Sequence, residues 1–207
     1  MHETIPLKKS RVDEAIRRKK IRRILWTVGT LVAVAGVIWL IISFTAQSAK
    51  NAPGVRYEEV GREHIGLEAP LPKAYNSNPP SSGAHYASPA NWGVYDYEVN
   101  DKIFIHNLEH GGIWVAYRPS VSSKVVEDLK GIVSEFGGSK IVMAPRSAND
   151  ADIAVVAWMR VLKFDLADGV LSDPQKNEIH RFYRAFKNHG PEFVPDTMPG
   201  IDPKSVQ

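Results

Sequence analysis

Residues 24–46, ILWTVGTLVAVAGVIWLIISFTA, form an uninterrupted stretch without a charged side chain. As a helix, this stretch would be roughly 34 Å long at ~1.5 Å per residue, enough to cross a hydrocarbon core of ~30 Å. Trp26 and Trp39 lie toward its two ends, where indole rings favour the membrane interface. The stretch therefore predicts a transmembrane helix. A cleaved signal peptide is the weaker alternative, because its apolar core usually has only ~7–15 residues.

The charges on the two sides of this stretch differ strongly. Nine basic residues lie in the arm formed by residues 1–23, whereas only Lys50 and Arg56 are near the other end. The positive-inside rule therefore predicts a single-pass protein of the cell membrane, with a cytoplasmic N-terminus and an extracytoplasmic C-terminal domain. The lipid bilayer is its first predicted partner. Nucleic acid is not expected as a partner, because no basic patch interleaved with aromatic residues follows in the sequence.

The rest of the chain holds 17 basic and 20 acidic residues, so it is slightly acidic, and the excess of positive charge in the whole chain comes from the arm. Residues 47–56 are interpreted as a polar linker, residues 57–200 as one extracytoplasmic domain, and residues 201–207 as a tail. The sequence contains no cysteine, which excludes disulfides, thiolate ligands and a cysteine nucleophile.

The predicted domain has two parts of different composition. Up to about residue 100 it is rich in Pro, Gly, Ser and Asn, which indicates an irregular loop region. Regular patterns follow: strands are predicted at residues 103–105, 113–117, 140–144 and 153–164, and helices at residues 122–136 and 176–188. This ββαββα order predicts an α+β domain with its helices packed on a small sheet.

The residues best suited to chemistry are in the segment HNLEHGG, residues 106–112. Two histidines four residues apart with a carboxylate between them are a recognised way to hold a metal ion. H-x-x-E-H is also the signature of one class of zinc peptidases, in which the Glu activates a metal-bound water. The segment lies between two predicted strands and ends in two glycines, so a hairpin bend is expected here. The long helix that the peptidase motif requires is not expected here.

His85, in a loop rich in Pro and Ser, is the predicted third metal ligand beside His106 and His110. Three histidines are common at zinc sites, and a methionine ligand would suit copper, so the predicted cofactor is a copper or zinc ion. Met143 and Met198 are possible soft ligands, although a core strand explains Met143 more simply.

Glu109 can be interpreted as a direct ligand, as a partner that orients an imidazole, or as a catalytic base. For the histidine pair, a hydrogen-bonded core without metal is the alternative. The remaining histidines of the outer domain, His64, His180 and His189, are interpreted as surface residues.

Three motifs together resemble a bacterial family catalogued as domain of unknown function 3105. They are NPPSSGAH at residues 78–85, WGVY at residues 92–95, and HNLEHGGIWVAYRP at residues 106–119. The resemblance covers about residues 55–200, and its most specific element is H-x-LEHG. It implies an N-terminal membrane anchor and no established activity.

By matching position, the resemblance also implies a site at His85, His106, Glu109 and His110. One departure concerns cysteines that members often carry before Gly-Val-Tyr and near the C-terminus. This chain has Trp92 and Met198 there, so a disulfide or metal-binding role of those cysteines would be lost or altered.

The function predicted from these features is that of a membrane-anchored extracytoplasmic protein that binds copper or zinc through clustered histidines. A metal-dependent hydrolase that uses Glu109 as its base is one alternative. The other is a structural or partner-binding domain of a membrane complex that holds no metal, whose interaction surface would be the aromatic residues near the loop. Whether the protein is an enzyme stays open at this point.

Overall fold

The computed structural model describes residues 6–206, with side chains at residues 12–44, 47 and 51–206. The chain forms two compact units that divide between Ala52 and Pro53. The first five residues of the predicted basic arm and Gln207 of the predicted tail lie outside the described residues.

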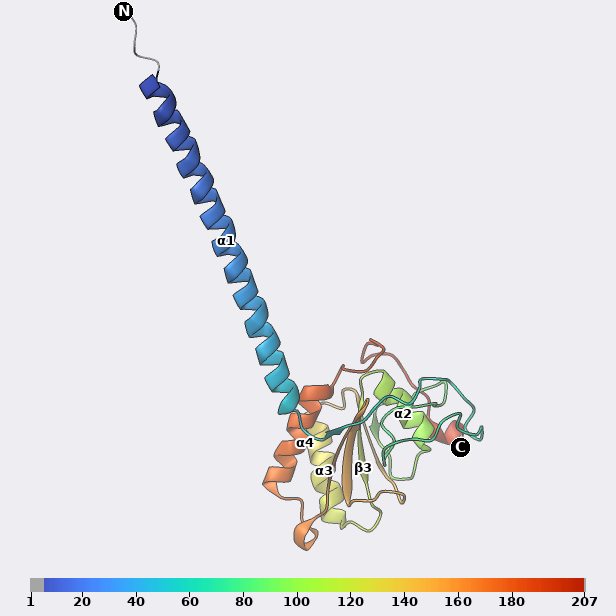
Figure 1. Cartoon of the computed structure of the whole chain (residues 1–207). Coiled ribbons are helices and arrows are strands. Elements are labelled where there is room, and N and C mark those ends of the chain that lie inside the picture. The colour runs from blue at the N-terminus through green and yellow to red at the C-terminus, as the bar shows by residue number, and fades with distance from the viewer. Residues whose placement is uncertain (1–5, 207) are drawn as a thin grey trace, which may run out of the picture. The chain divides into compact units, whose positions relative to one another are not determined.

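The first unit is one long helix, α1, from Pro6 to Lys50 (Figure 1). Its segment Val12–Phe44 is long and apolar enough to cross a membrane, and a signal sequence would share these properties. The predicted span, residues 24–46, lies inside α1, which also continues into the first four residues of the predicted linker. The hydroxyl groups of Thr27 and Thr30 donate to backbone carbonyls four residues earlier, so these polar groups are satisfied within the helix.

The second unit contains a six-stranded mixed sheet with the strand order β1-β6-β5-β3-β4-β2. Strand β3 pairs in parallel with β4 and antiparallel with β5, and β5 and β6 form an antiparallel hairpin. The strands are β1 Val55–Arg56, β2 Gly93–Val94, β3 Ile113–Tyr117, β4 Ile141–Pro145, β5 Ile153–Ala157 and β6 Arg160–Phe164. The helices are α2 Asp101–Glu109, α3 Ser123–Glu135 and α4 Asp173–Phe186, with short 3-10 turns at Ala167–Gly169 and Pro203–Ser205.

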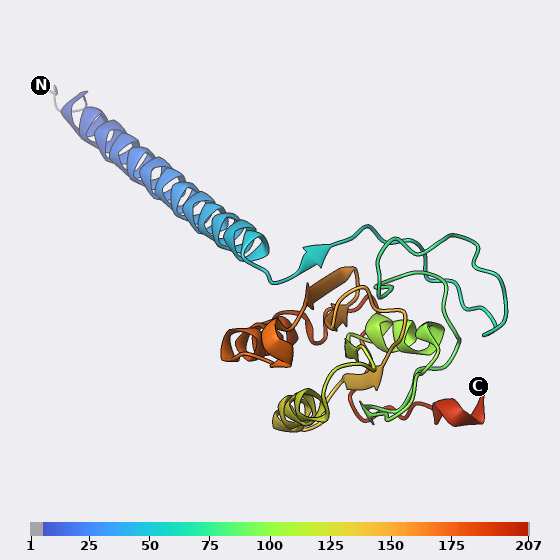
Figure 2. The ribbon, with the colours of Figure 1, turned by 90° about the horizontal axis from the view of Figure 1, so that it is seen from below.

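The two faces of the sheet carry two separate hydrophobic clusters, because successive side chains of a strand point to opposite faces. Helices α3 and α4 cover one face, and α2 covers the other together with irregular chain before it (Figures 1 and 2). Strand β4 shows the alternation: Ile141 and Met143 pack toward α3 and α4, and Val142 and Ala144 pack on the α2 side. The sheet thus separates the α2 side, where the candidate site lies, from the α3 and α4 side.

The predicted α+β class is confirmed, but the predicted ββαββα order is wrong in two places. Residues 103–105, expected as a strand, belong to α2, and residues 153–164, expected as one strand, are the hairpin β5–β6 with its turn at Met159 (φ 60°). In the second unit, apart from the two-residue strands β1 and β2, the observed order from α2 to α4 is αβαβββα. The first error arises because residues 103–105 are buried all round, so hydrophobicity loses the period that separates helix from strand. The second arises because neither Gly nor Pro marks the turn at Met159.

The Pro- and Gly-rich part of the domain is largely irregular, as predicted, and it is held in place by the C-terminal residues. The amide of Asn91 donates to the carbonyl of Ile201 at 2.9 Å, and the amide of Ile201 donates to the carbonyl of Pro89 at 2.8 Å. Val206 packs against the cluster on the α2 side. The predicted tail is therefore packed on the domain through residues 201–206.

Candidate metal centre

Helix α2 brings His106 and Glu109 to one face, three residues apart, and His110 caps its C-terminus. The side chain of Asn100 accepts from the amide of Lys102 at 3.0 Å and begins the helix. Gly111 (φ +75°) ends it, with its amide donating to the carbonyl of Leu108 at 2.9 Å. The expectation of a hairpin bend at residues 106–112 is therefore wrong: the HNLEH segment is the last turn of a buried helix.

His85 reaches the same place from the irregular region. Its amide donates to the carbonyl of Glu63 at 2.9 Å, and its carbonyl accepts from the amide of Ile65 at 2.7 Å. These bonds form a parallel bridge between His64 and His85. Next to it, Gly83 has φ +127°, and a Cβ there would lie 2.8 Å from the ring of Tyr75. A glycine is thus required at the turn that delivers His85 to the site.

Four side chains converge: His64, His85, His106 and Glu109 each offer a ligand atom, and these atoms all lie within 4.8 Å of one another. His85 Nε2 is 3.0 Å from Glu109 Oε2, and His64 Nε2 is 3.8 Å from the same oxygen. The ligand atoms of a tetrahedral ion with ~2.0–2.1 Å bonds lie about 3.3 Å apart. Small side-chain rotations would therefore give the four donors this spacing.

Backbone carbonyls fix the orientation of two of the imidazoles. His85 Nδ1 lies 2.8 Å from the carbonyl of Gly83, and His106 Nδ1 lies 2.7 Å from the carbonyl of Tyr86. A carbonyl only accepts, so each Nδ1 carries the hydrogen and, in the neutral ring, each Nε2 keeps its lone pair. In metalloproteins, this arrangement fixes the tautomer of a histidine ligand.

Burial sets the charge of the site. It lowers the pKa of His106 to about 4, so this ring is neutral at neutral pH and its Nε2, which lies 3.1 Å from His110 Nε2, keeps a lone pair. Burial by itself would raise the pKa of Glu109. The hydrogen bond with His85 and the electrostatic effect of the neighbouring histidines outweigh that effect and lower the pKa of Glu109 below its usual range. The centre is therefore a buried carboxylate surrounded by imidazoles.

His110 lies beside this group and is not one of its four members. Its Nε2 is 3.1 Å from His106 Nε2 and 3.3 Å from Glu192 Oε2. Burial lowers the pKa of His110, against the opposing charge of Glu192. The carbonyl of His110 accepts from the buried Lys140 Nζ at 2.8 Å.

Of the residues predicted from sequence, His85, His106 and Glu109 are brought together, and His64 is the member that sequence reasoning missed. Its side chain is 48% exposed, so the prediction of an exposed residue is correct, but its ring stacks on His106 at a centroid distance of 5.0 Å. The feature that brings His64 to the site is its backbone bridge to His85, which the local sequence does not reveal.

The other candidates lie elsewhere. His180 is on α4, where it pairs with Glu135 at 2.8 Å, and His189 is exposed. Met143 packs on the opposite face of the sheet, and Met198 is 52% exposed.

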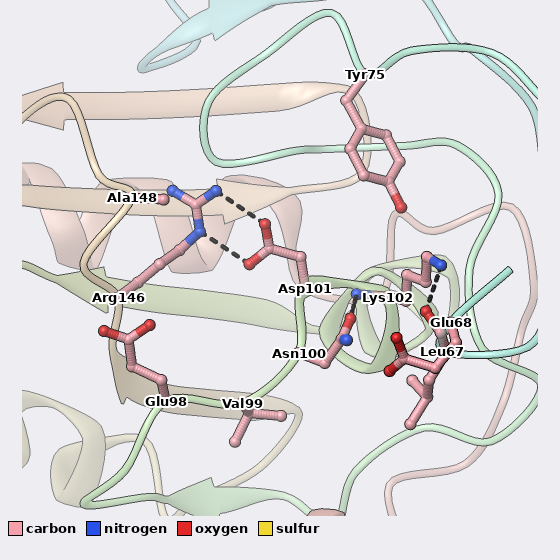
Figure 3. Close-up of a pocket in the computed structure, with 10 residues that line it drawn as sticks. All are labelled: Leu67, Glu68, Tyr75, Glu98, Val99, Asn100, Asp101, Lys102, Arg146 and Ala148. Atoms are coloured by element: carbon pink, nitrogen blue, oxygen red, sulfur yellow. Dashed lines mark hydrogen bonds and ion pairs between the residues drawn. The ribbon is translucent and has the colours of Figure 1, made fainter. Parts of the chain in front are cut away.

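A pocket of about 580 Å3 opens near the other end of α2 (Figure 3). The guanidinium of Arg146 meets the carboxylate of Asp101 there through two bonds of 2.8 Å, and Lys102 Nζ donates to backbone carbonyls of residues 66, 67 and 69. Both cations of this pocket are thus used to fasten the start of α2. The Tyr75 hydroxyl donates to the carbonyl of Ala84 at 2.7 Å, which ties the pocket wall to the His85 loop.

Comparison with known proteins gives one finding. Residues 70–197 match the model of a family described as "Protein of unknown function (DUF3105)". This range includes His85, His106, Glu109 and His110, and His64 lies before it. No curated protein and no solved structure matches the chain.

Proposed function

The chain belongs to this family of proteins of unknown function (DUF3105), and we propose that its outer domain binds one divalent transition metal ion, zinc or copper. The proposed ligands are the imidazoles of His64, His85 and His106 and the carboxylate of Glu109. The observation that carries the proposal is the convergence of these four donor atoms within 4.8 Å of one another, three of them on buried residues.

The alternative, a hydrogen-bonded core without metal, requires an added proton between His85 and Glu109. Because His85 Nδ1 carries the hydrogen, the Nε2 of a neutral ring and the carboxylate oxygen are two acceptors facing each other at 3.0 Å. Either a proton shared by the pair or a metal ion must lie between them. A metal ion would bind the Nε2 of His106 as well, which otherwise contacts His110 Nε2 at 3.1 Å.

The donor set favours zinc or copper(II) over other ions. Three nitrogen atoms and one carboxylate oxygen are borderline donors that suit these two metals, whereas calcium and magnesium prefer oxygen ligands alone. The sequence offers no thiolate, and Met143 is behind the sheet. Glu109 lies inside the donor set, and this favours its role as a ligand over that of a base in a hydrolase.

The long helix supports a membrane location for this domain. An apolar span preceded by a basic arm is expected to place residues 47–207 outside the cytoplasm. In that compartment the domain would meet metal ions before they enter the cell.

Metal analysis tests the proposal. The full chain, purified in detergent and incubated with zinc or copper, is expected to hold about one ion per chain by mass spectrometry. The double variant His85→Ala/His106→Ala is expected to lose it. His180→Ala, which removes a histidine on the opposite face of the sheet, is the matched control and should retain the ion. Equal metal contents in all three proteins would refute the assignment of the site.

A further inference from the structure

The four proposed ligands differ sharply in their access to solvent. The side chains of His85 and Glu109 are 0% and 3% exposed, and His106 is 4% exposed as a residue. The side chain of His64 is 48% exposed. The site therefore has a closed inner wall of three donors, and His64 is its solvent-facing side.

The ligands also differ in how they are fastened. His85 and His106 each bond a backbone carbonyl through Nδ1, and Glu109 stands on a buried helix. No hydrogen bond holds the ring of His64 within the described residues; it rests on the ring of His106 and lies 3.8 Å from the Glu109 carboxylate. Only its backbone is fixed, through the bonds that its neighbours make to residue 85.

A side chain that is exposed and, among the described residues, held by no hydrogen bond can rotate while the other three proposed ligands stay in place. The carbonyl of Glu63 and the amide of Ile65 remain bonded to His85 whichever rotamer His64 adopts. Rotation of the His64 side chain would let solvent take the place of its imidazole at the site. For an exposed residue that no metal holds, such a rotation takes picoseconds to nanoseconds.

We propose that His64 is the exchangeable ligand of the site, through which the metal ion enters and leaves. This inference rests on the proposed metal binding and gives the ion the role of cargo. In the transfer step, an incoming nitrogen or oxygen donor bonds to the metal as the His64–metal bond breaks. The ion then leaves from the exposed side, and no electron is transferred. The acceptor is a chelating molecule, or a partner protein that presents imidazole or carboxylate groups.

Exchange kinetics test the inference on the full chain in detergent. The zinc-loaded protein is mixed with excess 4-(2-pyridylazo)resorcinol, and the coloured zinc complex is followed by stopped flow. The rate for His64→Ala is expected to exceed that of the wild type at least ~10-fold, while one ion per chain is still bound at saturation. His180→Ala should exchange like the wild type.

Rescue by free imidazole distinguishes the loss of a metal ligand from a general weakening of the site. With cobalt(II) as the spectroscopic probe, His64→Ala is expected to show an altered visible spectrum, which added imidazole restores together with slow exchange. His85→Ala should not be rescued, because its position is fully buried. Exchange in His64→Ala at the wild-type rate, or no rescue by imidazole, would overturn the inference with metal binding intact. A wild-type chain that binds no metal would overturn the proposed function itself.

Discussion

Asn107 provides the strongest test of how the candidate site is assembled. Its side chain is completely buried, and it pairs with the backbone of Ala90 in both directions. The amide of Ala90 donates to Asn107 Oδ1 at 2.9 Å, and Asn107 Nδ2 donates to the carbonyl of Ala90 at 2.8 Å. This pair fastens α2 to the segment that begins with His85 and continues through Tyr86, whose carbonyl orients His106.

The substitution Asn107→Ala would leave the amide and the carbonyl of Ala90 without their partner, on a residue that is 1% exposed. Each buried backbone group that loses its bond costs about 1–3 kcal/mol, so we expect a loss of roughly 3 kcal/mol in the free energy of unfolding. With a slope of about 2 kcal/mol per molar urea, the midpoint should fall by about 1.5 M. Because the segment that carries His85 loosens, the affinity for metal should fall by ~10–100-fold.

The assay is urea unfolding of the fragment 53–207 with a chelator present, so that metal binding does not contribute to stability. This fragment is suitable because both hydrophobic clusters consist of residues from position 57 onward. Asn177→Ala, an exposed asparagine on α4, is the control and should change the free energy by less than about 0.5 kcal/mol. A loss below about 1 kcal/mol for Asn107→Ala would refute the reasoning, since Ala90 would then find other partners.

Two further substitutions test the two ends of α2. A Cβ in Gly190→Ala would collide with the carbonyl oxygen of Glu109, so we expect a loss of about 1–3 kcal/mol in the same assay. Gly131→Ala, in open space on α3, is the control and should instead increase the free energy of unfolding by about 0.5–1 kcal/mol. Losses of equal size in the two variants would show that the collision does not matter. Arg146→Lys cannot keep both bonds to Asp101, a partly exposed carboxylate, so a smaller loss of about 1–2 kcal/mol is expected. A variant as stable as the wild type would contradict the role of this pair.

The sequence was sufficient to predict features that depend on composition and strong patterns. The apolar run of residues 24–46 predicted a helix long enough for a membrane, and the amphipathic stripes of residues 122–136 and 176–188 predicted α3 and α4. The patterns of α3 and α4 survive folding because each of these two helices keeps one apolar face toward the sheet.

The missed features depend on contacts between distant residues. The run Ile103-Phe104-Ile105 has the composition of a strand, and only its burial on both sides in the fold explains a helix there. His64 joins the site because two irregular segments pair at a single bridge, and no local pattern marks such a bridge. His85, His106 and Glu109 were candidates from sequence because of their residue types and because Glu109 lies between two histidines, 106 and 110, that are four residues apart.

The secondary structure of residues 101–109 decides which ligand set is available. In an extended strand, residues three apart point to opposite faces, so His106 and Glu109 would diverge while His106 and His110 shared a face. In a helix, residues three apart share a face, and Glu109 joins His106 at the site. A strand would thus have left the carboxylate free as a base beside an all-histidine site. In the proposed site, the helix would make it an anionic ligand that partly neutralises a bound dication in a buried environment. This difference is the physical reason why we propose metal holding and exchange rather than hydrolysis.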